Sequence, residues 1–240
     1  MKFTRALPFA LLIGATHAQE GIATKPAGAV KPQWDIVETT VSVERGHAVY
    51  RKRVSGRAGA LKPGKTGKLA GSRVFSYVWP TSLDPAEAGF EPKSGILAFA
   101  VTAHPDFDDT PLFDENGDGN LANDGGLWHS HWVVLAPDET CGPKGLKVRD
   151  IAKDEKPRLP KTWPGLPLFI DSPGYTPVFK GATLSVRVPI ENVGALEGAK
   201  FDGVSAGLRV NASMHAPLLC VENVFKVTSG DLSLPGRVKR

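Results

Sequence analysis

The sequence predicts an all-β fold: a single β-sandwich, immunoglobulin-like or jelly-roll-like, with long loops rich in proline and glycine. Short apolar or alternating runs are separated by turn residues, and no stretch has the period of an amphipathic helix. The 26 glycines and 20 prolines suit the many turns of such a fold. The expected strands are Trp34 to Glu44, Ala48 to Val54, Ser72 to Trp79, Ile96 to Ala103, Leu127 to Ala136, Ala182 to Ile190, Val204 to Ala212 and Leu218 to Thr228.

The first 18 residues have the features of a cleaved signal peptide. Lys2 and Arg5 precede an apolar run from Ala6 to Ala15, and the small residues around Ala18 suit a cleavage site. This run is too short to span a bilayer, which needs about 20 residues, and no other stretch qualifies. We therefore expect a periplasmic or secreted product without a membrane span. Residues 19–33, rich in Gly, Ala, Lys and Pro, are expected to form a flexible tail, and residues 34–240 a single domain.

Charge and cysteine content narrow the class of protein. The net charge of +4 includes the two basic residues of the signal peptide, and the remaining Lys and Arg are interspersed with Asp and Glu. This pattern argues against a nucleic-acid partner. Cys141 and Cys220 can pair in an oxidising compartment. Two buried thiols or two thiolate metal ligands are the alternatives.

An acidic loop at residues 114–124 predicts a calcium site. Alternating oxygen donors and a central glycine are the pattern of a calcium loop, and crowded carboxylates repel one another unless a cation neutralises them. The proposed ligands are Asp114, Asn116, Asp118, Asn120 and Asp124, with Asp106, Asp108 or Asp109 as alternatives to Asp124. Over these eleven residues the loop resembles the EF-hand and dockerin type, although Gly125 stands where that type closes with Glu. An ordinary exposed turn, which uses the same residue types, is the competing interpretation.

Three histidines form a candidate transition-metal site for Zn²⁺ or Cu²⁺. His129 and His131 alternate with tryptophans on one expected strand, so both imidazoles face the same side of the sheet. His104 follows the preceding expected strand, and antiparallel pairing of the two strands would bring it near His129. His215, with Met214 as a soft neighbour, is a weaker fourth candidate. Hydrogen bonding within the sheet or to the acidic loop is the alternative role.

The sequence is compatible with three functions. The first, a metal-binding module, is favoured over an enzyme because nothing in the sequence requires catalytic turnover. One alternative is a zinc-dependent hydrolase or lyase in which the three histidines leave a position for water and Asp106, Asp108 or Glu115 acts as base. The run from His129 to Trp132 resembles the His-x-His strand of α-carbonic anhydrases, but over four residues only. The other alternative is a carbohydrate-binding module with structural calcium, suggested by the five tryptophans. The expected partners are therefore metal ions and, as a further possibility, a protein or carbohydrate ligand.

Overall fold

The structure, a computed structural model, describes residues 20–189, 196–213 and 217–238. The predicted signal peptide, and Met214 and His215, lie outside the described residues. Within them, no helix has the length and apolarity needed to cross a bilayer.

The described chain is nearly all β, as predicted. Besides strands it has short 3-10 helices at Pro85–Ala88 and Glu139–Cys141. The strands are β1 (Gly21–Ala23), β2 (Ile36–Glu44), β3 (His47–Val54), β4 (Arg73–Pro80), β5 (Ile96–Ala103), β6 (His129–Pro137), β7 (Leu146–Val148), β8 (Ile170–Asp171), β9 (Val178–Lys180), β10 (Thr183–Pro189), β11 (Lys200–Phe201), β12 (Val204–Val210), β13 (Leu219–Val227) and β14 (Gly236–Arg237).

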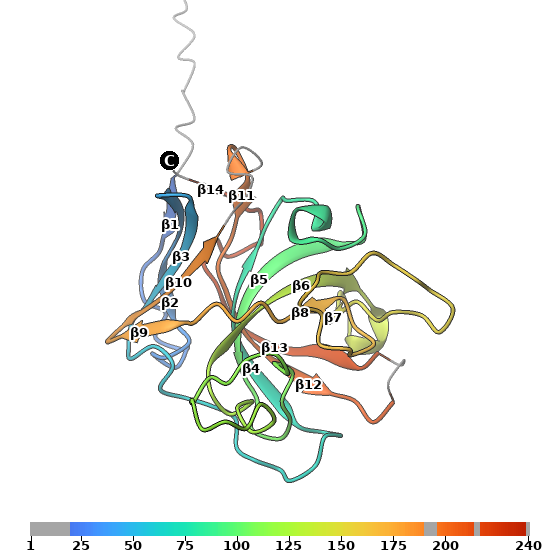
Figure 1. The fold of residues 1–240 in the computed structure, drawn as a ribbon. Helices are drawn as coiled ribbons and strands as arrows, with labels where there is room; N and C mark the ends of the chain where they lie inside the picture. Colours follow the sequence, from blue (N-terminus) through green and yellow to red (C-terminus); the bar gives the residue numbers. More distant parts are fainter. Residues whose placement is uncertain (1–19, 190–195, 214–216, 239–240) are drawn as a thin grey trace, which may run out of the picture.

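These strands form a barrel with a sheet packed on its outside (Figure 1). The outer sheet is antiparallel and has the order β1-β2-β3-β10-β9. The order β5-β4-β12-β13-β7-β6 closes into a barrel because β5 also pairs with β6. Strand β8 adds to β6, and β11 pairs with β14 in a separate two-stranded sheet.

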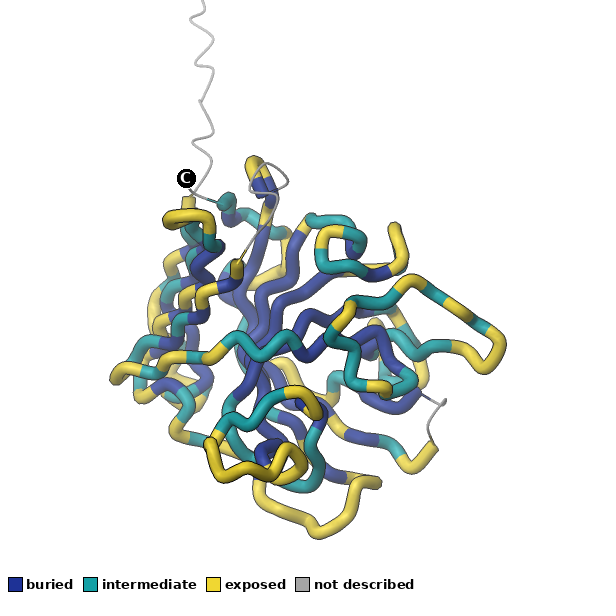
Figure 2. Tube along the Cα trace, in the orientation of Figure 1, coloured by how far each residue is buried: buried dark blue, intermediate teal, exposed yellow. Residues whose placement is uncertain are grey.

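The predicted single β-sandwich is not confirmed, because one of the two expected layers closes on itself. Of the barrel strands, β4, β5, β6 and β12 are buried along most of their length, and therefore on both faces, whereas the middle of β13 is exposed. Buried residues are dark blue in Figure 2. In β5, Leu97, Phe99 and Val101 pack outward against the five-stranded sheet, whereas Ala98 and Ala100 belong to the apolar core inside the barrel. A strand buried on both faces reads as a continuous apolar run, and that run does not reveal whether its sheet closes.

The predicted flexible tail over residues 19–33 is wrong for its first part. Gly21–Ala23 forms the edge strand β1, with Ile22 opposite Thr39, and the Ile22 side chain is buried. Further along, the backbone N–H of Ala27 donates to Asp35 Oδ2 at 3.0 Å. An edge strand gains its hydrogen bonds from the neighbouring strand, so it can form with few apolar side chains of its own. Amino-acid composition alone therefore does not predict such a strand.

The predicted disulfide is confirmed: Cys141, at the end of the second 3-10 helix, is bonded to Cys220 in β13. The bond closes a loop with a sequence separation of 79 residues. Because a long closed loop restricts the unfolded chain, we expect Cys141→Ala with Cys220→Ala to lower the free energy of unfolding by about 3 kcal/mol. Urea unfolding under oxidising conditions measures this difference. Equal midpoints and slopes for the two proteins would contradict the expectation.

Candidate metal centre

The pairing of β5 with β6 brings the three predicted histidines together at one end of the barrel. Thr102 lies opposite His129 and Ala100 opposite His131, as the antiparallel prediction requires. The inward face of β6 carries Val133 and Leu135 deeper in the barrel, so the two histidines continue an apolar row. His104, directly after β5, joins them: its Nε2 lies 2.9 Å from His129 Nε2. The predicted convergence of the histidines is therefore confirmed.

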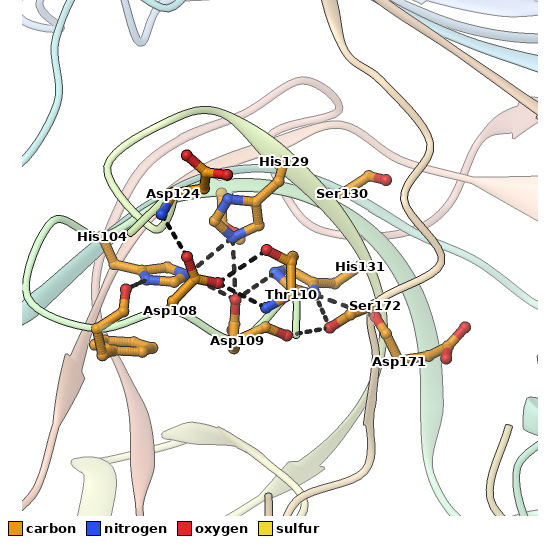
Figure 3. A network of polar contacts seen from close by, with 12 residues as sticks. His104, Asp108, Asp109, Thr110, Asp124, His129, Ser130, His131, Asp171 and Ser172 are labelled. Carbon is orange, nitrogen blue, oxygen red and sulfur yellow. Dashed lines mark hydrogen bonds and ion pairs between the residues drawn. The ribbon is translucent and has the colours of Figure 1, made fainter. Parts of the chain in front are cut away.

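Asp109 completes the cluster, and Figure 3 shows its carboxylate among the three imidazoles. Its Oδ1 lies 3.2 Å from Nε2 of His104, 3.2 Å from Nε2 of His129 and 3.4 Å from Nε2 of His131. One candidate ligand atom from each residue lies within 4.8 Å of the others, and all four residues are buried. A His₃Asp group of this size could hold a metal ion.

The outer nitrogen of each imidazole is held by a backbone carbonyl. His104 Nδ1 lies 2.9 Å from Phe107 O, His129 Nδ1 lies 3.1 Å from Leu127 O, and His131 Nδ1 lies 3.1 Å from Asp171 O. A carbonyl oxygen can only accept, so each Nδ1 carries the proton. In the neutral rings, the Nε2 atoms then present lone pairs to one another and to the carboxylate. In metal-bound histidines the nitrogen that faces away from the metal likewise donates its proton to a carbonyl or carboxylate, which fixes the tautomer and the ring orientation.

Two atoms in the interior of this group have no hydrogen-bond partner. Among the described residues, Asp109 Oδ1 and His131 Nε2 are buried polar atoms without a hydrogen-bond partner of normal geometry. Leaving such an atom unsatisfied costs about 1 to 3 kcal/mol, and more for a charged group. A cation at the centre would satisfy both atoms and relieve the repulsion among the lone pairs.

Burial and charge set the protonation of the cluster. Burial lowers the pKa of His129 to about 4, and its histidine neighbours act in the same direction, so this ring is neutral at neutral pH. Burial alone would raise the pKa of Asp109, but the histidines around it hold the pKa well below its usual range. Burial likewise opposes protonation of His104, yet the Asp109 charge raises the pKa of His104 overall. The carboxylate is therefore ionised and available as a ligand.

Neighbouring residues fix Asp109 in place. Asp108 Oδ1 accepts from the N–H and the hydroxyl of Thr110, both at 2.9 Å, and Asp108 Oδ2 accepts from the N–H of Asp124. Ser172 Oγ donates to Asp109 O at 2.6 Å and lies 3.2 Å from His131 Nδ1. The sequence interpretation considered Asp109 only as an alternative calcium ligand. Its place five residues after His104 on the loop between the two histidine strands was the available signal.

The predicted calcium ligands lie along their own loop, where their side-chain oxygens accept hydrogen bonds from backbone N–H groups of that loop. Asp114 accepts from the N–H groups of Gly117 and Gly119, Asn116 from Asp118 N–H, and Asp118 from Asn120 N–H. Asp124 is buried and accepts from Glu115 N–H at 2.8 Å. Asp106 belongs elsewhere, because its carboxylate accepts from the backbone of Thr66 and Gly67.

Comparisons with protein-family models, with curated proteins and with solved structures find no match to this chain.

Proposed function

We propose that this protein is a metal-binding module that holds one transition-metal ion, zinc in the first instance, with His104, Asp109, His129 and His131. The observation that carries the proposal is the convergence of three Nε2 atoms and one carboxylate oxygen in a buried site, with every Nδ1 committed to a carbonyl. Imidazole and carboxylate donors suit Zn²⁺, and imidazole also suits Cu²⁺.

Asp109 favours a binding role over the zinc hydrolase or lyase. That alternative needs three protein ligands and a fourth position for water, whereas structural zinc sites have four protein ligands. Here Asp109 Oδ1 lies where the three Nε2 atoms converge and would take the fourth position. The candidate base Asp108 is engaged with backbone N–H groups of Thr110 and Asp124. We therefore keep the binding module as the proposal.

The five tryptophans, all within the described residues, form no exposed aromatic platform for the carbohydrate-binding alternative. Trp34, Trp79 and Trp132 are buried, and Trp128 and Trp163 are half-buried with their indole N–H groups bonded to the carbonyls of Gly59 and Leu168. Trp132, next to the histidines, packs against Tyr50 and Phe99 between the barrel and the outer sheet. Sugar rings stack on accessible aromatic faces, so these side chains do not favour that function.

Export to the periplasm or outside the cell is part of the proposal. The features of the first 18 residues motivate it. The Cys141–Cys220 disulfide supports it, because such bonds persist in oxidising compartments.

The deciding experiment is elemental analysis of protein purified without chelator. The natural protein is expected to carry about one equivalent of zinc or copper, and the double variant His129→Ala with His131→Ala is expected to carry none. His47→Ala is the matched control, because His47 lies at the start of β3, outside the cluster. Stoichiometric metal in the double variant, or none in the natural protein after incubation with zinc and copper salts, would refute the site.

Acid is expected to release the metal. In the loaded protein all three histidines are unprotonated, whereas unfolded histidines take up protons below their ordinary pKa of about 6.5. Proton uptake therefore favours the unfolded state as the pH falls, and the stability supplied by the metal declines below that value. His129, with its pKa lowered to about 4 by burial, is expected to protonate late in the metal-free fold. Metal content after dialysis from pH 7.5 to 4 measures the release, and full retention at pH 4 would contradict it.

We also propose that the acidic loop binds calcium weakly. Gly117 and Gly119 adopt φ of 73° and 87°, which lets the backbone turn tightly between the oxygen donors. At 5 mM calcium and a submillimolar affinity, stabilisation of about 1 to 2 kcal/mol is expected, a rise of about 3 to 6 °C in melting temperature. Asp118→Ala should lose this rise, and Asp154→Ala, an exposed aspartate elsewhere, should keep it. An equal calcium response in both variants would exclude the loop as the site.

A further inference from the structure

The interior of the barrel holds a cavity that the metal centre does not use. Its volume is about 240 Å³. Lining side chains come from all six barrel strands and are mainly Val, Leu and Ile. At one end His104, Asp109 and His131 line it, and outside this cluster the lining residues are uncharged. A space this apolar has few polar partners for water.

Small side chains account for the empty space. Ala100 in β5 and Ala206 in β12 face the lumen, whereas Val204 and Leu208, which flank Ala206 on the inward face of β12, are larger. Protein interiors are normally close-packed, and each void forfeits contacts among its lining atoms. A barrel with alanine side chains facing the lumen retains space for a ligand.

The other end of the cavity reaches the surface. Ile96, at the start of β5, is 40% exposed, Val224 is 52% exposed and Leu232 is 41% exposed, yet all three line the cavity. Ile96 and His104 lie at opposite ends of β5, so the cavity runs along the barrel from an apolar rim to the metal centre. Exposed apolar side chains that cluster around a cavity mark a binding site rather than ordinary surface.

The segment after β13 holds two leucines over this rim in an unfavourable backbone conformation. Leu232 has φ of 60° and Leu234 has φ of 53°, and both side chains line the cavity. Left-handed φ is rare for residues other than Gly, Asn and Asp, and such strain concentrates at ligand-binding segments. Side-chain hydrogen bonds of Ser229 and Asp231 to the backbone also hold this segment, so the two leucines stay at the mouth of the cavity.

We propose that the lumen binds a small, uncharged, apolar molecule that enters between Ile96, Val224 and Leu232. Its size follows from the volume: a 150 Å³ apolar cavity holds benzene, so 240 Å³ holds about ten non-hydrogen atoms. A slender alkylbenzene or a similar hydrocarbon has this size. An ionised ligand is disfavoured, because the walls outside the metal centre carry no charged side chain to pair with it.

The test is calorimetric titration with toluene, n-butylbenzene and n-octylbenzene, which have seven, ten and fourteen carbons. Affinity should rise about fourfold per added CH₂ from toluene to n-butylbenzene and then stop rising once the lumen is full. The charged analogue 4-phenylbutyrate should bind at least tenfold more weakly than n-butylbenzene. Lack of binding by all three hydrocarbons, continued tightening at n-octylbenzene, or equal binding of 4-phenylbutyrate would overturn the proposal.

A variant locates the ligand within the molecule. Ala206→Leu puts a larger side chain into the lumen and is expected to weaken n-butylbenzene binding at least tenfold. Ala152→Leu, an exposed position, should leave it unchanged. Undiminished binding in folded Ala206→Leu would show that the site is not the lumen. Should Ala206→Leu fail to fold, the chain-length series on the natural protein decides the proposal without it.

Discussion

Zinc is expected to raise the free energy of unfolding of the metal-free protein by about 5 kcal/mol, the largest effect that any single addition should have. The estimate follows from mass action: at free zinc about ten thousand times the dissociation constant, binding to the native state alone supplies this amount. For a domain of this size the melting temperature should rise by about 10 to 20 °C. Calorimetry on protein stripped with a chelator and then reloaded measures it.

The physical reason for this stabilisation lies in the geometry of the metal-free site. Without an ion, three buried Nε2 atoms and a carboxylate oxygen face one another within 4.8 Å, and two of these atoms, Asp109 Oδ1 and His131 Nε2, lack a hydrogen-bond partner. A bound metal would remove this penalty and would join the end of β5, the following loop and the start of β6. The site is preformed by its Nδ1 contacts, so little ordering opposes binding.

Matched variants separate metal binding from general stability. His129→Ala with His131→Ala should abolish the zinc response, and His47→Ala should retain it. Asp109→Asn keeps the shape of the side chain but removes its charge. This variant should therefore still fold, but it should bind zinc more weakly than the natural protein. A full zinc response in the double histidine variant would mean that zinc stabilises the fold from another place.

The sequence predicted the histidine part of this centre but not its carboxylate. Strand alternation is enough to put His129 and His131 on one face, and the antiparallel connection is enough to place His104 beside them. Asp109 lies in a loop whose path depends on turns around Asp108 and Asp124. Residues in such a loop follow no regular alternation, so their positions cannot be predicted from periodicity. Neighbouring aspartates offered equally good candidates.

Barrel closure was unpredictable for a related reason. The apolar runs of β4, β5 and β6 predicted strands, and their locations were largely correct. A sandwich and a barrel both need inward-facing apolar residues on these strands. The pairing of β5 with β6 was itself predicted. The difference lies in whether β4 and β6, the two neighbours of β5, also connect through β12, β13 and β7, which closes the sheet. Those are long-range choices that one strand's composition does not encode.

Gly125→Ala is expected to destabilise the protein by at least about 4 kcal/mol and to abolish metal binding. A methyl group on Gly125 would lie 1.7 Å from Phe107 O and 2.8 Å from His104 O, and both are backbone atoms that no side-chain rotation can remove. The close approach also carries a hydrogen bond from His104 N–H to Gly125 O at 2.7 Å. Relief of the clash must therefore displace the segment from His104 to Asp109, which carries two of the four proposed metal ligands.

Gly126→Ala is the matched control, because its methyl group would meet Pro105 at 3.6 Å, an ordinary contact. It should change the free energy of unfolding by less than about 1 kcal/mol and leave one equivalent of metal bound. The comparison tests the link between loop packing and the metal centre, since adjacent glycines differ only in what their added carbon would touch. If Gly125→Ala were as stable as Gly126→Ala and still bound zinc, the approach of the two loop segments would not be what positions His104 and Asp109.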